Sequence, residues 1–172
     1  MNKVAIVTGG SFGIGLAVVE KLLSENYQVF NLDIAPSEVG IFVECDVSCV
    51  ETVKRCIAEI IMQTGRVDAL VSNAGKHLSA TIEDTDEATL DTLFNLNVKG
   101  AYAAIQAVLP SMKAQQNGAI VLMASDQAII GKPNSFAYNL TKSSLASMAK
   151  TTALDYAKFN ICLLYTSDAA DE

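Results

Sequence analysis

The sequence is poor in the residues that several kinds of catalytic and metal site require. It has a single histidine, His77, which lies in a predicted loop, and this argues against a Ser-His-Asp triad or a multi-histidine metal centre. Its four cysteines show no paired CxxC spacing, and they fall within apolar patterns where free thiols behave as small hydrophobic groups. We therefore expect neither a metal site nor a disulfide.

Clusters of basic residues and long apolar runs are also missing. Twelve Lys and Arg against nineteen Asp and Glu give a net charge of −7, so nucleic acid is not an expected partner. No apolar run approaches the length of about eighteen residues that a membrane helix needs. Because Met1 is followed almost at once by the first apolar strand, we expect no signal peptide and predict a soluble, cytoplasmic protein. A chain of 172 residues is most simply one domain.

Short apolar segments alternate with helix-patterned segments along the chain. Strands are predicted at 4–7, 28–33, 41–45, 68–72 and 118–124. Helices are predicted at 16–23, from a capping box at Ser48 and Glu51 to a stop at Gly65, at 86–112 and at 135–158. Strands that are apolar on both faces and alternate with helices are typical of a parallel sheet covered on both sides. The sequence thus predicts an α/β fold with a doubly wound parallel sheet.

A glycine-rich turn, Thr8–Gly15, joins the first strand to the first helix. Gly9, Gly13 and Gly15 permit a tight turn, a close approach of the backbone to a pyrophosphate, and close packing of the helix on the sheet. The phosphates would meet the free N–H groups at the helix N-terminus. Asp33 ends the second strand eighteen positions after Gly15, near the offset at which an acid binds the adenosine ribose. Together these residues predict a bound dinucleotide.

The residues around this acid favour NAD over NADP. The carboxylate of Asp33 can accept hydrogen bonds from ribose hydroxyls but would repel a 2′-phosphate. Neither Gly10, Ser11 nor Ile34 supplies the cation that a 2′-phosphate requires.

A second group of residues points to proton transfer. Tyr138 and Lys142 are four positions apart on a predicted helix, so their side chains project from the same face. An ammonium beside a phenol favours the phenolate, which makes Tyr138 a candidate general acid/base. Ser125 follows the fifth strand and Asn73 follows the fourth, at the carboxyl edge where open parallel sheets bind ligands. Asn97 interrupts an apolar helix face, where a satisfied structural amide is the simpler interpretation.

The ordered set TGxxxGxG, NAG, helix Asn, strand-end Ser and YxxxK, between Thr8 and Lys142, resembles the short-chain dehydrogenase/reductase family, and the resemblance covers about residues 2–161. It implies a three-layer α/β/α Rossmann fold and an NAD(P)-dependent oxidoreductase that interconverts an alcohol and a ketone or aldehyde. The implied catalytic residues are Asn97, which holds a relay water, Ser125, Tyr138 and Lys142. The implied cofactor-binding residues are Gly9, Ser11, Phe12, Gly13, Ile14, Gly15, Asp33, Asp46, Val47, Asn73, Ala74, Gly75, Tyr138 and Lys142, with Asp46 and Val47 at the adenine.

The end of the chain departs from the family pattern. We expect residues 1–161 to form a truncated dinucleotide-binding domain lacking the family's final strand, and residues 162–172 to be a non-family tail that resembles translated adapter sequence with a frayed acidic end. Ile161, Leu163 and Tyr165 alternate as in a short sixth strand. A fragment without turnover is therefore one alternative.

Two other functions remain open, as does the substrate. A nucleotide-binding protein of this fold without turnover would keep the glycine turn, and an S-adenosylmethionine methyltransferase also has a glycine turn and a strand-end acid. The loops 76–85 and 126–134 should line the substrate side, and their mixed polarity permits sugars, polyols, acyl thioesters or simple alcohols. Small and apolar residues of the two long helices (Ala101, Ala103, Ala104, Ala107, Leu145, Ala146, Ala149, Ala153) predict a homodimer or homotetramer.

Overall fold

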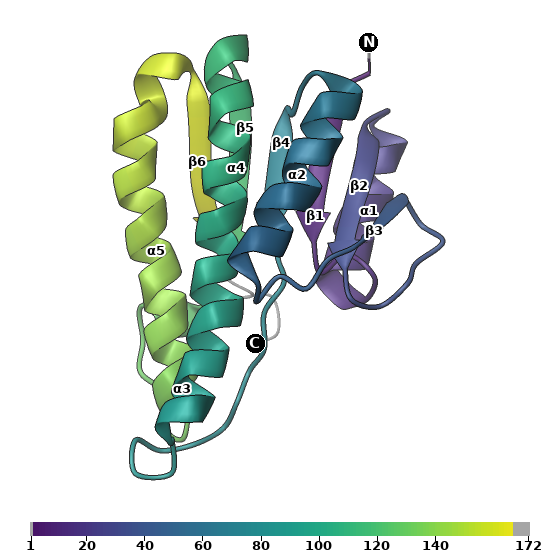
Figure 1. Cartoon of the computed structure of the whole chain (residues 1–172). Helices are drawn as coiled ribbons and strands as arrows, with labels where there is room; N and C mark the ends of the chain where they lie inside the picture. The colour runs from purple at the N-terminus through teal and green to yellow at the C-terminus, as the bar shows by residue number, and fades with distance from the viewer. Residues whose placement is uncertain (1, 167–172) are drawn as a thin grey trace.

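A computed structural model describes residues 2–166 of the chain and contains a six-stranded, all-parallel sheet with strand order β3-β2-β1-β4-β5-β6 (Figure 1). The strands are β1 (Val4–Thr8), β2 (Gln28–Asp33), β3 (Ile41–Glu44), β4 (Ala69–Ser72), β5 (Gly118–Met123) and β6 (Ile161–Thr166). This is the predicted α/β architecture of the Rossmann type.

Helices cover both faces of this sheet. They are α1 (Gly13–Ser24), α2 (Val50–Thr64), α3 (Glu87–Phe94), α4 (Gly100–Gln115) and α5 (Phe136–Tyr156). The helices α2, α4 and α5 lie on one face, and α1 lies on the other, behind β1 and β2 in Figure 1. None of the helices in residues 2–166 combines the length and apolar character needed to cross a membrane.

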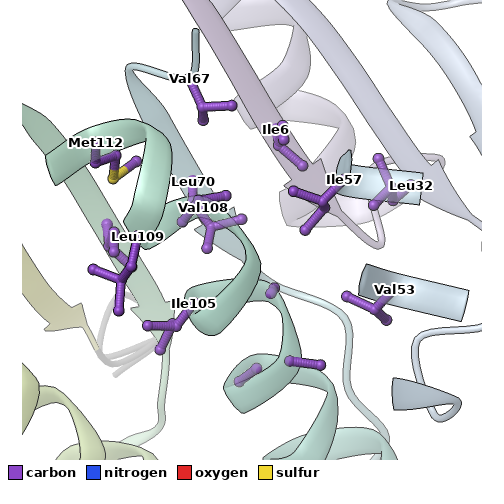
Figure 2. Close-up of a cluster of buried hydrophobic side chains, with 14 of the residues drawn as sticks. Ile6, Leu32, Val53, Ile57, Val67, Leu70, Ile105, Val108, Leu109 and Met112 are labelled. Atoms are coloured by element: carbon purple, nitrogen blue, oxygen red, sulfur yellow. The ribbon is translucent and has the colours of Figure 1, made fainter. Parts of the chain in front are cut away.

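The alternation of side chains along each strand divides the core into two layers. Ile6 of β1 packs with Ile57 of α2 and Val108 of α4, as Figure 2 shows. Its neighbours Ala5 and Val7 point to the other face and pack with Val19 of α1. Each such fully buried aliphatic side chain stabilises the fold by about 1.5–3 kcal/mol.

The strand order places a ligand crevice at the centre of the sheet. β1 pairs with β2 on one side and with β4 on the other. The chain therefore builds β1, β2 and β3 outward in one direction, then returns and builds β4, β5 and β6 in the opposite direction. Ligands bind outside the carboxyl ends of the strands at such a switch point.

Two predictions about the helices need correction. Ser48 does not cap α2: the N-cap is Cys49, which makes no side-chain cap hydrogen bond, and the hydroxyl of Ser48 donates to Asp46 Oδ1 at 2.7 Å. The predicted helix 86–112 is not one regular helix, because a π turn at Asn95–Lys99 separates α3 from α4. The predicted stop at Gly65 is confirmed, with its φ of 74° and its N–H bound to Ile61 O.

The alternation predicted for the sixth strand is confirmed. Ile161 and Leu163 of β6 are buried and Cys162 and Leu164 are exposed, and β6 pairs with β5 along its whole length. The acidic residues of the predicted tail, 167–172, lie outside the described residues.

Candidate active site

The glycine turn between β1 and α1 lies directly against the end of β4. Gly9 has a φ of 67°, a left-handed conformation, and a Cβ there would stand 2.8 Å from Ala74 Cα. A Cβ on Gly15 would stand 2.0 Å from Gly9 O. Both positions therefore require glycine, for backbone conformation and close approach respectively.

A buried amide in β2 fixes the shape of this turn. Asn31 is 0% exposed; its Oδ1 accepts a hydrogen bond from Gly10 N at 3.0 Å, and its Nδ2 donates to Ser11 Oγ at 3.1 Å. Ser11 Oγ in turn donates to Ala35 O at 2.6 Å. The hydroxyl of Ser11 thus holds the turn in place, while Asn31 was absent from the predicted site. An asparagine between Phe30 and Leu32 in an apolar strand is the sequence signal that identifies it.

The carboxylate of Asp33 is held at the end of β2. Its Oδ2 accepts from Ser11 N at 3.0 Å and its Oδ1 from Ala35 N at 3.1 Å. Two backbone donors fix its orientation and leave lone pairs for further donors such as ribose hydroxyls.

A pocket of about 520 Å³ opens beside Asp33, at the carboxyl ends of the central strands. Its lining includes nine of the predicted cofactor residues: Gly9, Phe12, Ile14, Asp33, Asp46, Val47, Asn73, Ala74 and Gly75. Ser11, Gly13 and Gly15 shape the turn but do not line the pocket. Apolar side chains stand at its mouth, where Phe12 is 69% and Ile34 72% exposed. No lysine or arginine of residues 2–166 belongs to this lining.

Side-chain hydrogen bonds join the ends of β1 and β4. Thr8 Oγ1 accepts from Asn73 N and from Ala74 N, both at 3.1 Å, and Asn73 Nδ2 donates to Gly9 O at 2.9 Å. The glycine turn and the segment Asn73–Gly75 are therefore one connected wall of the pocket.

Asn97 lies in the π turn between α3 and α4, a type of helix irregularity that is frequent at functional sites. Its Oδ1 accepts from Lys76 N at 2.9 Å, and its two N–H groups go to Lys76 O and to Thr141 Oγ1, both at 3.0 Å. Asn97 thereby ties the loop after β4 to helix α5. Both of its donors are in use, so a relay water would have to bind the remaining lone pair of Oδ1 or the backbone carbonyl.

Tyr138 and Lys142 lie one turn apart on α5, with Lys142 Nζ 5.5 Å from the centre of the Tyr138 ring. Lys142 is only 6% exposed and donates to Met123 O at 2.5 Å. Burial lowers the pKa of its ammonium from 10.5 to about 8. The positive charge of Lys142 therefore lies next to the phenol, although removing this charge from water costs free energy.

Tyr138 and Lys142 line a second pocket, of about 260 Å³, together with Ile14, Asn73, Gly75, Lys76, His77, Met123 and Ala124. Ile14, Asn73 and Gly75 line both pockets. The two pockets are therefore adjacent, and an extended ligand can occupy both.

Ser125 follows β5, as predicted, and its hydroxyl is bound to a neighbour. Ser125 Oγ donates to Asp126 Oδ1 at 2.8 Å and accepts from Gln127 N at 3.2 Å. The hydroxyl of Ser125, and then the N–H of Gln127, hold the pKa of Asp126 below its ordinary range. A rotation about one bond would free the hydroxyl of Ser125 for a substrate oxygen.

His77 belongs to the loop 76–85, which was expected on the substrate side, and it stands beside Tyr138, a contact that the sequence did not predict. The centres of the two rings are 4.6 Å apart and the rings meet edge to face. The sequence feature that identifies His77 is its position two residues after the Asn73–Gly75 segment. Within residues 2–166, no group of three His, Cys, Asp or Glu side chains is placed to hold a metal ion.

The chain is similar in sequence to known proteins of one family. The sequence profile of the short chain dehydrogenase family matches residues 3–165. The chain is 32% identical to a sorbitol-6-phosphate 2-dehydrogenase of Klebsiella pneumoniae, over 93% of this chain and 66% of that protein. It is 33% identical to a 3-oxoacyl-[acyl-carrier-protein] reductase FabG of Staphylococcus epidermidis, over 94% of this chain and 72% of that protein. The chain thus spans about two thirds of the length of these relatives.

Solved structures agree closely with this fold. A short-chain dehydrogenase from Streptomyces avermitilis superposes with a TM-score of 0.92 at 28% identity, over 97% of this chain and 65% of that one. The structure of ElxO with NADP bound superposes with a TM-score of 0.91 at 29% identity, over 97% of this chain and 73% of that one.

Proposed function

The chain belongs to the short-chain dehydrogenase family of oxidoreductases, and we therefore propose that it interconverts an alcohol and a ketone or aldehyde with a nicotinamide dinucleotide. One observation carries the proposal most directly. The pocket beside the glycine turn and Asp33 adjoins the pocket that contains Tyr138 and Lys142. A nucleotide-binding protein without chemistry has no need of the second pocket.

The residues present fit a dinucleotide. Asp33 offers a fixed carboxylate to ribose hydroxyls, and Gly9 and Gly15 bring backbone rather than side chain to the start of α1. Lys142 Nζ lies 3.7 Å from where a Cβ on Gly75 would stand. That places its ammonium at the wall shared by the two pockets, where a nicotinamide ribose would be within its reach. The bound nicotinamide would supply or accept the hydride.

We assign the proton transfer to side chains of the protein. In carbonyl reduction, Tyr138 donates its phenolic proton to the reacting oxygen, and in alcohol oxidation it removes the proton. The ammonium of Lys142 favours the phenolate electrostatically. Ser125 turns its hydroxyl from Asp126 to the reacting oxygen and helps to polarise it. General acid/base catalysis of this kind contributes about 10²–10⁴-fold to the rate.

Asn97 fixes the relative position of the segments that carry these groups. Through its bonds to Lys76 and Thr141 it holds the loop after β4 at a fixed distance from α5, and any water on its remaining acceptor would extend the proton path from Lys142. Its replacement by Ala would release the loop as well as remove the acceptor.

We propose NAD rather than NADP as the cofactor. The carboxylate of Asp33 disfavours a 2′-phosphate, and the described residues that line the larger pocket include no cation to neutralise one. The hydroxyl of Ser11, the other group near this position, already donates to Ala35 O. The relatives do not decide the matter, since ElxO is described with NADP bound.

The proposal also includes a cytoplasmic location, supported by four free cysteines, two of them buried and two exposed. A homodimer or homotetramer is the proposed assembly, and small alcohols or carbonyl compounds are the proposed substrates.

The proposed function is tested by two measurements in sequence. The first is NADH binding, followed through the change in NADH fluorescence as the purified protein is added. The second is NADH oxidation with a panel of ketones, aldehydes and keto sugars, with the matched NAD reactions of the alcohols. Binding with turnover of at least one substrate pair is expected. Binding without turnover across the panel would favour the nucleotide-binding alternative, and absence of binding would overturn both.

A further inference from the structure

His77 lines the catalytic pocket, but the proton transfer described above gives it no task. Its loop is fixed at both ends. The backbone of Lys76 is bound by the side chain of Asn97, and Ala80 pairs with Ser135, with Phe136 N donating to Ala80 O at 3.1 Å. An exposed side chain on this loop is therefore held in one place relative to α5.

The imidazole of His77 has one nitrogen occupied and one available. Its Nε2 lies 3.5 Å from the hydroxyl of Ser135, a buried residue three positions before Tyr138. Its Nδ1 has no hydrogen-bond partner among residues 2–166. The edge-to-face contact with Tyr138 fixes the plane of the ring. A ring oriented by two neighbours, with a free nitrogen in a pocket, is arranged to bind something in that pocket.

The other walls of this pocket offer few free polar groups. Ile14, Met123 and Ala124 are apolar, Asn73 Nδ2 is bound to Gly9 O, and Lys142 is bound to Met123 O. Tyr138 is reserved for the reacting oxygen. His77, with the ammonium of Lys76 beside it, supplies the remaining polar surface, and no carboxylate from residues 2–166 lines the pocket.

We propose that His77 binds a second oxygen atom of the substrate through Nδ1, on the carbon next to the one that reacts, and so selects vicinally oxygenated alcohols such as diols, polyols and 2-hydroxy acids over simple alcohols. The inference rests on the proposed function. Because the His77 and Tyr138 rings are in direct contact, groups held by the two rings are neighbours on the substrate. The basic side chains that the described part of the chain contributes to this lining suit a hydroxyl or carboxylate oxygen as the acceptor.

Packing alone is the simpler explanation of the ring contact, and His77→Phe separates the two explanations because it keeps an aromatic edge against Tyr138 and removes the nitrogens. With propane-1,2-diol or lactate as substrate, His77→Phe should lower kcat/KM about tenfold, mainly through KM, the loss of one good hydrogen bond. With propan-2-ol, which has no second oxygen, His77→Phe should change kcat/KM by less than about twofold. His77→Asn, which keeps a donor and acceptor near Nδ1, should restore part of the loss, and Ser79→Ala on the same loop serves as the control.

Equal losses on both kinds of substrate would mean that His77 acts only through Tyr138, and no loss on either would mean that it only packs. Both results overturn the inference while leaving the proposed function standing.

A second readout does not need turnover. His77 is the only histidine, so its imidazole carbon-bound protons give one identifiable set of signals in an NMR spectrum. In the presence of NADH these signals should shift on titration with lactate and not with propan-2-ol. Identical responses to the two compounds would overturn the inference. Failure of the proposed function would instead be seen in the wild type, as absence of NADH binding or of turnover.

Discussion

Lys142 is a charged side chain held almost out of water. Its ammonium lies beside Tyr138, and burial lowers its pKa to about 8. Because the folded pKa is below the unfolded one, the unfolded chain binds more protons between the two values, and the stability of the protein rises with pH across this window. Below pH 8 the protein keeps a penalty of roughly 3 kcal/mol for holding the charge.

We therefore expect Lys142→Met to be more stable than the wild type at pH 7, by about 1–2 kcal/mol once the lost bond to Met123 O is counted. It should also bind NADH more weakly and lose activity. The free energy of unfolding, measured by urea denaturation from pH 7 to above 10, should show this advantage shrinking as the pH rises. Lys150→Met, at an exposed position of the same helix, is the control. If the extra stability of Lys142→Met did not change with pH, the charge of Lys142 would not be its cause.

Asp33 is the residue that we propose sets the choice between NAD and NADP. Replacing it with Ala and introducing Ile34→Arg removes the carboxylate and adds a cation for a 2′-phosphate. The double variant should shift the ratio of kcat/KM for NAD and NADP at least tenfold toward NADP, an effect of about 1.4 kcal/mol. Kinetics with both cofactors give this ratio directly. A wild type that already prefers NADP would show that Asp33 has been assigned the wrong role.

At the scale of secondary-structure elements, one ion pair secures the central strands. The carboxylate of Asp68, just before β4, accepts from Val4 N at 2.8 Å and from Arg66 through both of its oxygens. Burial alone would raise the pKa of Asp68, but the hydrogen bonds from Arg66 and Val4, with the charges of Arg66 and Lys3, outweigh it and lower the pKa below the ordinary 3.8. Its stabilisation is thus present above pH 3.8 and lost as the pH falls through the lowered value.

Asp68→Asn should therefore destabilise the protein at neutral pH by about 1–3 kcal/mol, since it removes the ion pair and leaves Arg66 partly buried. The loss should diminish below pH 4, where the wild type also loses its charge. Thermal unfolding of both proteins between pH 3 and 7 measures the difference, with Asp155→Asn, at an exposed position of α5, for comparison. A constant difference over this range would contradict the assignment.

The elements that depend on local pattern were predictable from the sequence. The strands follow apolar runs, and α2 follows a helical period that ends at Gly65, a residue that takes the required left-handed conformation. The π turn at Asn97 was not predictable as such, because its amide is satisfied by Lys76 and Thr141, groups distant in the sequence. The N-cap at Cys49 differed for a local reason: the hydroxyl of Ser48 donates to Asp46, two residues before it, instead of capping α2.

The same division holds at the candidate site. Residues of motifs, such as Gly9 and Tyr138, line the two adjoining pockets. Asn31 and His77 belong to no motif, and only the packing of separate segments reveals what they contact. Their roles depend on tertiary structure rather than on local spacing.

At the scale of the whole molecule, the long helices bury more of their apolar residues than the sequence indicated. Of the residues that predicted an interface, six are buried within the chain: Ala101, Ala103, Ala104, Leu145, Ala146 and Ala149. The large apolar side chains that α4 and α5 expose are instead Tyr102, Leu140 and Leu154, the last of these 82% exposed. The proposal of an oligomer therefore rests on these three side chains.

Light scattering at micromolar concentration should give at least twice the mass of the 18.2 kDa chain. Leu154→Lys should weaken the association, because it places a charge in the proposed interface, whereas Ile82→Lys, an exposed apolar position outside both helices, should leave it unchanged. A monomeric mass for the wild type would contradict the proposed assembly.

We propose that the two adjoining pockets make this molecule a dehydrogenase in which Tyr138 transfers the proton, and the variant Tyr138→Phe separates this role from packing alone. The substitution removes one hydroxyl and keeps the ring that packs against His77. NADH affinity, by fluorescence, should stay within about twofold of the wild type, while turnover should fall by about 10²–10⁴, the usual contribution of a general acid. Turnover above about a tenth of the wild-type rate, far more than loss of a general acid permits, would contradict the role of Tyr138 as the general acid.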